Sequence, residues 1–487
     1  MNGYFLVAFI SYFAFFLGLS FYFYRKNSTA NSFIMGDRSV NYWVTAIAAQ
    51  ASDMSDWLFM GYPGLIYGLG IFNVWVAIGL VLFMFLNWHF IAPRLRRATE
   101  KYQSLTLASF FERRFADITG KLRLFTVFFS LWFLCFYIAA ELIGLGRLFE
   151  STFGLHYNIG IALSIGLVVA NILIGGFIAA AWSDMFRGFF LLAMIVIVPL
   201  VASSHLGGIT YHRILEAAAT SYPHISLSLI PDYSWATLGK ILSIVMGWGL
   251  GYFGSPHILI NFMGIKDPEK IAKAKYIGIT WQILVLAAAT WVGLVGIVFF
   301  PTALANRELV FVEMVKNLFH PLFAGFILCA VLAATMSVMT AQILAAASIV
   351  SEDLFKRLLK KPLSPQGSLW LIRSCVMAIP VLSYAISYNN TSAVNDLVSY
   401  AWSGLGLSFA PVVISALYGS HVTKEGAFAG MLTGGLLGII WPHLGFSFMP
   451  LLPGFIISLA VITVVSLATA KKTVPLEPFI YENNKLP

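Results

Sequence analysis

The sequence predicts an all-α polytopic membrane protein, and two observations support this fold class. Hydrophobic residues make up 59% of the 487 residues and charged residues only 10%, with a mean hydropathy of +0.84. A soluble domain of average composition carries about a quarter charged residues. Apolar stretches long enough to cross a bilayer also recur along the whole chain. Lipid is therefore the expected solvent for most of the protein surface.

About thirteen apolar stretches are long enough to cross, and each is expected to form a transmembrane helix. They are residues 3–24, 40–66, 70–92, 124–149, 158–182, 185–204, 237–263, 276–300, 319–350, 369–388, 393–419, 426–443 and 449–470.

Basic residues predict how these spans are oriented, because cytoplasmic loops carry an excess of Lys and Arg. With the N-terminus outside and the C-terminus in the cytoplasm, only a few of the 30 basic residues fall outside: Arg147, Arg213, Lys240, Arg307 and Lys316. The first stretch lacks a basic start and a clear cleavage site, so it is expected to be retained as a span. The expected location is a bacterial inner membrane.

Other protein classes find little support in the sequence. The net charge of +9 comes from basic residues gathered in short loops between spans, which favours control of topology over nucleic-acid binding. Common catalytic motifs such as a phosphate-binding glycine loop, HExxH and GxSxG are absent from the sequence. An enzyme is therefore not expected.

Polar residues interrupt the second stretch at its centre, in the run 51–57 (ASDMSDW). Asp53 and Asp56 are costly there, because each charge at mid-membrane costs about 3 kcal/mol even on insertion scales. Such residues persist where they face a cavity, an ion or a partner. Together with Ser52 and Ser55 they also allow the helix to unwind, which exposes carbonyls that can bind a cation.

Four glycines and a proline fall within the seventh stretch, in the run 247–256 (GWGLGYFGSP). Glycine and proline both disfavour a helix interior. Close helix packing through small residues is one explanation for them. The other is a second discontinuous helix that resumes at Pro256, with Trp248 and Tyr252 one turn apart as an apolar cradle.

The two interruptions lie five spans apart, which predicts two inverted five-helix repeats that each begin with a broken helix. The chain is thus expected to be one transmembrane domain over residues 1–487. Its expected parts are an extra N-terminal span (3–24), the first repeat (40–204), the second repeat (237–419), two extra C-terminal spans (426–470) and a cytoplasmic tail (471–487).

The ninth stretch also holds polar side chains, namely Ser337, Thr340 and Gln342. Hydroxyls within a helix can bond back to the carbonyl four residues earlier. Beside an unwound second span, Ser337 and Thr340 are instead candidate ion ligands.

Several motifs along most of the chain resemble those of the sodium/solute symporter family, most closely the bacterial sodium/proline symporters. They include GDRS (36–39), ASDMS (51–55), RLFESTFG (147–154), GLGYFG (249–254), SEDL (351–354) and LVSYAW (397–402). The resemblance implies a LeuT-like core of 5+5 inverted repeats with two discontinuous helices. It also implies alternating-access symport of a small amino acid, with proline as the expected substrate.

A sodium site made of oxygen ligands follows from the same resemblance, as suits a hard cation. Three backbone carbonyls and one hydroxyl would bind the ion, from Ala51, Met54, Ala334 and Ser337. Asp53 and Ser55 match the acidic and hydroxyl positions close to this site. Asp184 matches an acid near a second ion position in some relatives.

The resemblance also implies a proline pocket lined by Trp248, Tyr252 and Tyr137, with Tyr137 contributed by the fourth span. Ser52 and Pro256, at the two interruptions, complete the expected substrate site.

The sequence departs from the family pattern at four positions. Val338 replaces a Ser or Thr whose hydroxyl would complete the sodium shell. Asp56 and Glu141 stand at glycine or glycine-like positions, and Arg187 replaces a neutral residue three positions after Asp184. Asp56 can supply the missing sodium ligand. Alternatively Asp56 or Glu141 carries a proton, because a carboxyl removed from water favours its protonated form. Glu141 can also simply hydrogen-bond to a neighbouring helix.

The sequence therefore predicts a cation-coupled symporter whose expected partners are the substrate and the lipid bilayer. Na+ is the expected coupling ion and H+ the alternative, and another small organic solute is an alternative to proline. Neither nucleic acid nor an obligate protein partner is expected. A transporter-like sensor would need a signalling domain after the last span, and a channel would need a continuous pore in place of paired broken helices.

Overall fold

The computed structural model describes residues 3–24, 29–222, 224–355, 363–388, 393–446 and 448–470. Within these ranges the chain forms helices and no strand, apart from isolated bridges that join Val40 to Ile265 and Gly70 to Ser226. The all-α prediction is confirmed. The predicted tail, 471–487, lies outside the described residues.

The helices of the N-terminal half are α1 (Gly3–Tyr24), α2 (Ala30–Met35), α3 (Tyr42–Ala51), α4 (Gly61–Leu69), α5 (Val74–Leu86), α6 (Ala92–Lys101), α7 (Leu107–Arg114), α8 (Lys121–Phe153), α9 (Tyr157–His205) and α10 (Tyr211–Ser221). Those of the C-terminal half are α11 (Trp235–Gly249), α12 (Pro256–Met263), α13 (Ile271–Phe299), α14 (Val310–Leu318), α15 (Pro321–Ser348), α17 (Pro365–Ser387), α18 (Val394–Tyr418), α19 (Lys424–Ile440) and α20 (Leu451–Thr469). Short 3-10 or π segments are η1 (Gly36–Arg38), η2 (Asp56–Leu58), η3 (Ile71–Asn73), η4 (Asn87–Ile91), η5 (Leu250–Phe253), η6 (Pro268–Lys270), η7 (Arg307–Leu309), η8 (Ile349–Phe355) and η9 (Trp441–Leu444).

Ten helical stretches of the described chain are long and apolar enough to cross a membrane. One of them, α9, has 49 residues, whereas one crossing needs about 20. It bends at Gly176, whose φ of 57° and ψ of −161° suit a residue without a side chain. The fifth and sixth predicted spans therefore meet at Gly176 and not after residue 182, as the sequence had suggested. The total of thirteen spans stays a prediction.

Both predicted discontinuous helices are present, and each break has an identifiable local cause. Helix α3 ends at Ala51, and helical structure resumes only at η2 and α4. In the second repeat, α11 ends at Gly249, and η5 leads to an extended Ser255 before α12 begins at Pro256. Proline suits the first turn of a helix because it has no N–H to leave unpaired there.

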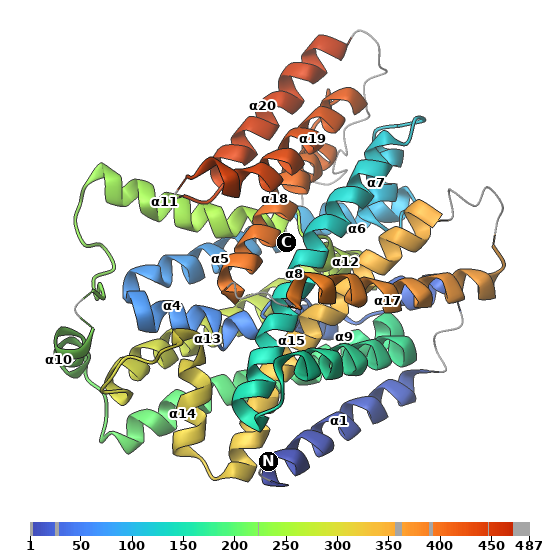
Figure 1. Ribbon diagram of the computed structural model, residues 1–487. Helices are drawn as coiled ribbons and strands as arrows, with labels where there is room; N and C mark the ends of the chain where they lie inside the picture. Colours follow the sequence, from blue (N-terminus) through green and yellow to red (C-terminus); the bar gives the residue numbers. More distant parts are fainter. Residues whose placement is uncertain are drawn as a thin grey trace.

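Helices α8, α9, α15 and α18 form the centre of the bundle (Figure 1). Helix α1 lies against α9 and α15 at one edge, while α19 and α20 pack on each other and on α18 at the opposite edge (Figure 1). The breaks of α3–α4 and α11–α12 thus lie among long helices.

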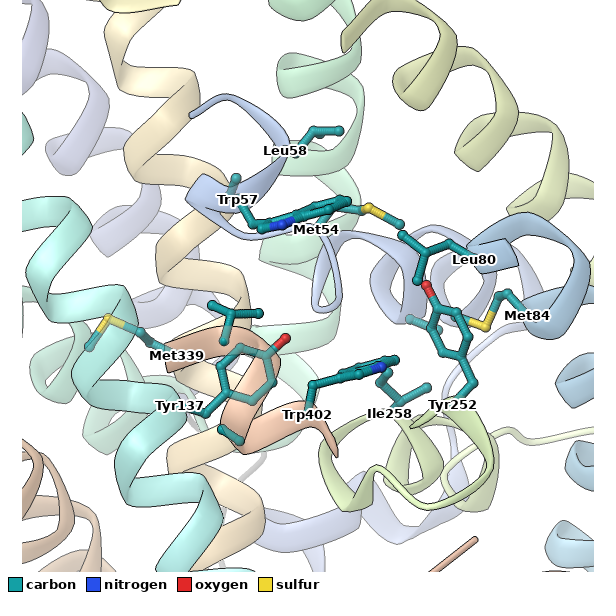
Figure 2. Packing of buried hydrophobic residues seen from close by; sticks show 14 of the residues in the cluster. Met54, Trp57, Leu58, Leu80, Met84, Tyr137, Tyr252, Ile258, Met339 and Trp402 are labelled. Atoms are coloured by element: carbon teal, nitrogen blue, oxygen red, sulfur yellow. The ribbon is translucent and has the colours of Figure 1, made fainter. Parts of the chain in front are cut away.

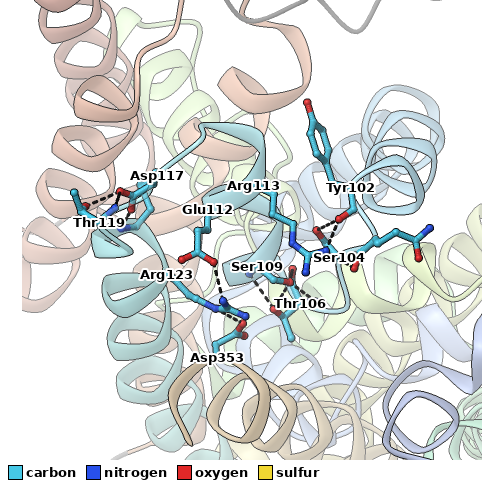
Figure 3. Close-up of polar contacts among 12 residues, drawn as sticks. Tyr102, Ser104, Thr106, Ser109, Glu112, Arg113, Asp117, Thr119, Arg123 and Asp353 are labelled. Atoms are coloured by element: carbon cyan, nitrogen blue, oxygen red, sulfur yellow. Dashed lines mark hydrogen bonds and ion pairs between the residues drawn. The ribbon is translucent and has the colours of Figure 1, made fainter. Parts of the chain in front are cut away.

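Ion pairs fasten one end of this bundle (Figure 3). The Arg123 guanidinium, near the start of α8, donates to Glu112 of α7 and to Asp353 of η8, each at 2.7 Å. Nearby, Arg38 donates to the carbonyl of Met263 at 2.8 Å, which joins the segment before α3 to the end of α12. The Arg38 side chain therefore joins the two broken helices at this end.

Candidate functional site

A small cavity, with a volume of about 20 Å³, lies between the two helix breaks. Its lining comes from both breaks and from α5, α8 and α18, through Asp53, Met54, Trp57, Leu80, Tyr137, Trp248, Tyr252, Val398 and Trp402. Figure 2 shows Tyr137, Trp402 and Tyr252 along one side and Trp57 on the opposite side. The Trp57 ring also lies 5.3 Å from the Trp248 ring, so aromatic faces enclose much of the space. The chemistry of this lining suits a small, largely apolar solute.

A hydrogen bond joins the two breaks directly. The Tyr252 hydroxyl donates to Oδ2 of Asp53 at 2.5 Å, and Gln282 of α13 donates to the same hydroxyl at 3.1 Å. Because Asp53 is only 9% exposed, this donor stabilises a carboxyl group that would otherwise lack a partner.

Side chains from neighbouring helices donate hydrogen bonds to the backbone carbonyls that the second break exposes. The Trp402 indole donates to the carbonyl of Trp248 at 2.8 Å, and the Asn87 amide donates to the carbonyl of Tyr252 at 3.0 Å. A Cβ added at Gly251 would stand 2.2 Å from the Trp402 ring. Close packing and helix breaking, the two explanations for these glycines, therefore both apply.

The first break has a different backbone arrangement. The Gln50 carbonyl accepts from the N–H groups of Asp53 and Met54, at 3.1 and 3.2 Å. Since α3 ends at Ala51, its last carbonyls have no partner within the helix. Within the described chain, no loop, turn or side-chain hydrogen bond ends on the carbonyls of Ala51 or Met54.

Helix α15 brings the other predicted sodium ligands to the same region, since it packs against both α3 and η2. Ala334, Ser337 and Thr340 are buried there. Neither the Ser337 nor the Thr340 hydroxyl makes a hydrogen bond to a described residue. Buried hydroxyls without partners are costly, and a bound cation would remove that cost.

Asp184 lies in α9 and forms an ion pair with Arg187 at 3.2 Å. Ser337 lies beside this carboxyl, but without the geometry of a hydrogen bond. The Arg187 guanidinium also lies 4.7 Å from the Phe16 ring of α1. A resident cationic side chain thus already faces the acid that the resemblance placed near a second ion position.

Asp56 and Glu141, the two acids that depart from the family pattern, face one another. Both are fully buried, and the carboxyl of Glu141 lies beside that of Asp56. A Cβ on Gly144, one turn beyond Glu141, would stand only 1.5 Å from Oδ2 of Asp56. The missing side chain at Gly144 leaves room for the Asp56 carboxyl against α8.

Two predicted substrate residues lie apart from the cavity lining. The Ser52 hydroxyl accepts a hydrogen bond from the Asn261 amide of α12 at 3.1 Å. Pro256 is buried at the first turn of α12. Ser55, a predicted ion-coupling residue, accepts from the N–H of Trp57 at 3.1 Å and begins η2. The structure therefore brings Tyr137, Trp248 and Tyr252 together at the cavity, without Ser52 and Pro256.

The sequence profile of the family described as "SSF: Sodium:solute symporter family" matches residues 33–434, which include both breaks and α15. The chain belongs to the sodium:solute symporter family.

Named bacterial transporters are similar to this chain over nearly its whole length. The high-affinity proline transporter PutP of Bacillus subtilis is 37% identical over 460 residues, which cover 93% of this chain and 95% of the relative. The sodium/proline symporter of Escherichia coli is also 37% identical, with 95% and 92% covered.

Solved structures show the same fold as this family member. A Na+-coupled sialic acid symporter superimposes with a TM-score of 0.82 at 16% identity, covering 98% of this chain and 99% of the other. MhsT, solved in complex with L-phenylalanine, gives a TM-score of 0.55 at 14% identity, covering 88% and 98%. The LeuT-like fold is thereby confirmed.

Sequence reasoning about this family member missed two side chains that enclose the cavity. Trp57 closes the run 51–57 that was singled out for its charges, and Trp402 ends the LVSYAW motif. Both lie in runs that the sequence analysis had selected, one for its charges and one as a family motif. Neither feature shows that these indoles face the second break. Gln282 and Asn87, which donate to Tyr252, are single polar residues in apolar spans and gave a weaker signal.

Proposed function

We propose that the protein is a sodium-coupled symporter of proline that works by alternating access. The observation that carries this proposal is the aromatic cavity between two breaks, with unpartnered oxygen ligands beside one break. The names of the relatives in Bacillus subtilis and Escherichia coli support proline as the solute and sodium as the ion.

Sodium would bind between the end of α3 and α15. Its ligands would be the carbonyls of Ala51, Met54 and Ala334 and the hydroxyl of Ser337. The ion replaces missing hydrogen-bond partners at the break and joins two elements that do not bond directly there. It therefore stabilises the arrangement in which both are close, which is how an ion shifts a conformational equilibrium.

Proline would occupy the cavity and pack its ring against Tyr137, Trp248 and Tyr252. Bound proline thereby contacts both repeats. The hydrogen bond from Tyr252 to Asp53 would link the proline site to the proposed sodium site. Because ion and substrate favour the same closed arrangement, each raises the affinity for the other. Asp184 and Thr340 would support the ion site from α9 and α15.

The basic residues of the loops support an orientation with the N-terminus outside and the C-terminus in the cytoplasm. We place the protein in the plasma membrane of a bacterium on the same grounds, since the similar proteins are bacterial.

Uptake of labelled proline into proteoliposomes tests the proposal, with sodium and proton gradients imposed separately. The expected result is accumulation that requires sodium and is abolished when the gradient is collapsed. Trp248→Ala should raise the proline concentration needed for half-maximal uptake, whereas Gly166→Ala should not, because nothing lies within 4 Å of a Cβ there. Uptake that ignores sodium, or no proline uptake by a folded protein, would refute the proposal.

A further inference from the structure

An apolar groove of about 460 Å³ lies between α5 and α13, apart from the substrate cavity. Its lining is one stripe of α5, within residues 74–85, and one stripe of α13, within residues 279–290. Leu82 and Ile283 from the two stripes are exposed, so the groove faces the lipid. Among the lining residues only Thr290 is polar, and its hydroxyl already donates to a carbonyl of its own helix. The groove therefore suits a hydrocarbon chain.

A buried lysine lies at one end of this groove. Phe85 is the last residue of the α5 stripe, and the Nζ atom of Lys275 in α13 lies 4.8 Å from the centre of its ring. On the other side, the ring of Tyr276 lies 4.7 Å from the same nitrogen. Lys275 is only 5% exposed. The end of the groove therefore places an ammonium group between two aromatic faces.

This ammonium group has no counter-ion in the described chain. Lys275 forms no ion pair with a described acid. It donates to Nδ1 of His89 at 3.0 Å, but an ammonium has three hydrogens, and no described residue accepts the other two. A charge removed from water without a partner is costly. The site therefore lacks a group that is negatively charged and rich in acceptors, as a phosphate is.

Neighbouring charges place this end of the groove at the depth of the lipid headgroups. Lys270 forms an exposed ion pair with Asp267, and Glu269 forms one with Arg97, and these charges need water. Lys275 follows little more than one turn later in the chain. The segment 266–275 contains four lysines and only these two acids. Such an excess of positive charge beside a bilayer favours anionic lipids over neutral ones.

We propose that the groove between α5 and α13 binds an anionic phospholipid, with an acyl chain along the two apolar stripes and the phosphate on the Lys275 ammonium. The phosphate supplies the missing counter-ion and accepts the two remaining hydrogens. A zwitterionic lipid binds less well, because it brings a positive charge of its own to a site that is already positive. This site lies apart from the proposed sodium and proline sites and does not rest on the proposed function.

Photolabelling of the purified full-length protein in phosphatidylcholine vesicles tests the site. The vesicles contain a small fraction of phosphatidylglycerol, or of phosphatidylcholine, with a diazirine on one acyl chain, and mass spectrometry identifies the labelled peptides. The phosphatidylglycerol probe should label residues 74–85 and 279–290 more than α20, a helix that also exposes apolar side chains such as Val464 and Leu467. The phosphatidylcholine probe should show no such preference. Equal labelling of these regions by phosphatidylglycerol would overturn the proposal.

Two lysine variants test the role of the ammonium group. Lys275→Gln should lower labelling of the groove by phosphatidylglycerol about fivefold, the loss expected for one lysine that faces an anionic lipid. Lys273→Gln is the matched control, since Lys273 is exposed on the same helix and its loss removes the same charge. Unchanged labelling in folded Lys275→Gln protein would overturn the proposal. An equal loss in both variants would also overturn it, because it would show a general attraction to the basic segment.

A variant of the apolar stripe keeps the test decisive if Lys275→Gln does not fold. Ala287 is exposed within the groove, so Ala287→Phe fills the space without entering the interior. Labelling of α5 by phosphatidylglycerol should fall in this variant and persist in Gly166→Phe, where nothing lies within 4 Å of a Cβ. Wild-type labelling in Ala287→Phe would overturn the proposal. Loss of the wild-type labelling in phosphate buffer would also overturn it, because it would show that Lys275 prefers a soluble phosphate ion.

Discussion

The two helix breaks solve the same problem, a helix interrupted within a membrane, in opposite ways. In the second break, side chains from neighbouring helices donate to the exposed carbonyls of Trp248 and Tyr252. In the first break, the carbonyls of Ala51 and Met54 face no such donor in the described chain. The carbonyls of the second break are therefore paired within the protein, whereas we propose that those of the first bind an ion.

Charged residues also differ between the two breaks. Two acids, Asp53 and Asp56, belong to the first break, whereas the second contributes glycines and aromatic rings. The carboxyl groups of the breaks thus lie in the first repeat, while both repeats line the cavity. Asp53 and Tyr252 are the direct link between the two halves.

The largest expected effect comes from cutting this link. Asp53→Ala removes the acceptor and leaves the Tyr252 hydroxyl buried with less hydrogen bonding. A hydrogen bond to a charged group contributes about 1.5–3 kcal/mol, so sodium-driven proline uptake should fall about 10- to 100-fold. Initial uptake rates in proteoliposomes measure this loss, with Tyr252→Phe as the matched change on the donor. Wild-type rates in Asp53→Ala would show that the breaks are not coupled through this bond.

Close packing of the second break predicts the next effect. A Cβ at Gly254 would stand 2.7 Å from the N atom of Ala410 and 2.8 Å from the carbonyl oxygen of Leu405, both in the backbone of α18. Gly254→Ala should therefore lower the free energy of unfolding by about 1–3 kcal/mol.

Thermal unfolding in detergent compares this variant with Gly239→Ala in α11, where a Cβ would meet nothing within 4 Å. Equal melting temperatures for the two variants would contradict the packing described for the second break.

A smaller effect is expected from removing one hydrogen bond to a backbone carbonyl of the second break. Trp402→Phe keeps an aromatic wall on the cavity but removes the N–H that donates to Trp248. Losing one hydrogen bond of this kind costs about 1 kcal/mol, or about fivefold in proline affinity. Equilibrium binding of proline measures it. The sodium affinity should stay unchanged, and a parallel loss of sodium binding would place ion ligands in the second break.

The smallest expected effect comes from adding an oxygen ligand to the proposed sodium site beside the first break. Val338, next to Ser337 in the buried part of α15, has a methyl group where a threonine would carry an oxygen. Val338→Thr should strengthen sodium binding about threefold, which is less than about 1 kcal/mol. Sodium dependence of proline uptake measures this gain. No change would show that the sodium shell is complete without position 338.

The sequence was informative where a residue type is costly in lipid. Asp53 and Asp56 marked the first break and the glycines 247–254 marked the second, because neither pattern suits a continuous apolar helix. Gly176 was missed because it interrupts the backbone inside a run that stays apolar, so hydropathy does not change there.

Contacts across the fold could not be predicted in this way. Asp56 and Glu141 were both recognised as unusual, but their approach depends on how η2 packs over Gly144. The side chains that close the second break, Trp402 and Asn87, also come from other spans. Such pairings are set by tertiary packing, which local periodicity does not record.

Binding of radioactive sodium to the purified full-length protein tests most directly the claim that the first break holds the ion. The comparison is wild type, Ser337→Ala beside the first break and Asn87→Ala beside the second. The account predicts that Ser337→Ala weakens sodium binding about tenfold, since an ion loses about 1.4 kcal/mol with one ligand, while Asn87→Ala leaves it unchanged. Unchanged binding in folded Ser337→Ala protein, with a loss in Asn87→Ala, would contradict it.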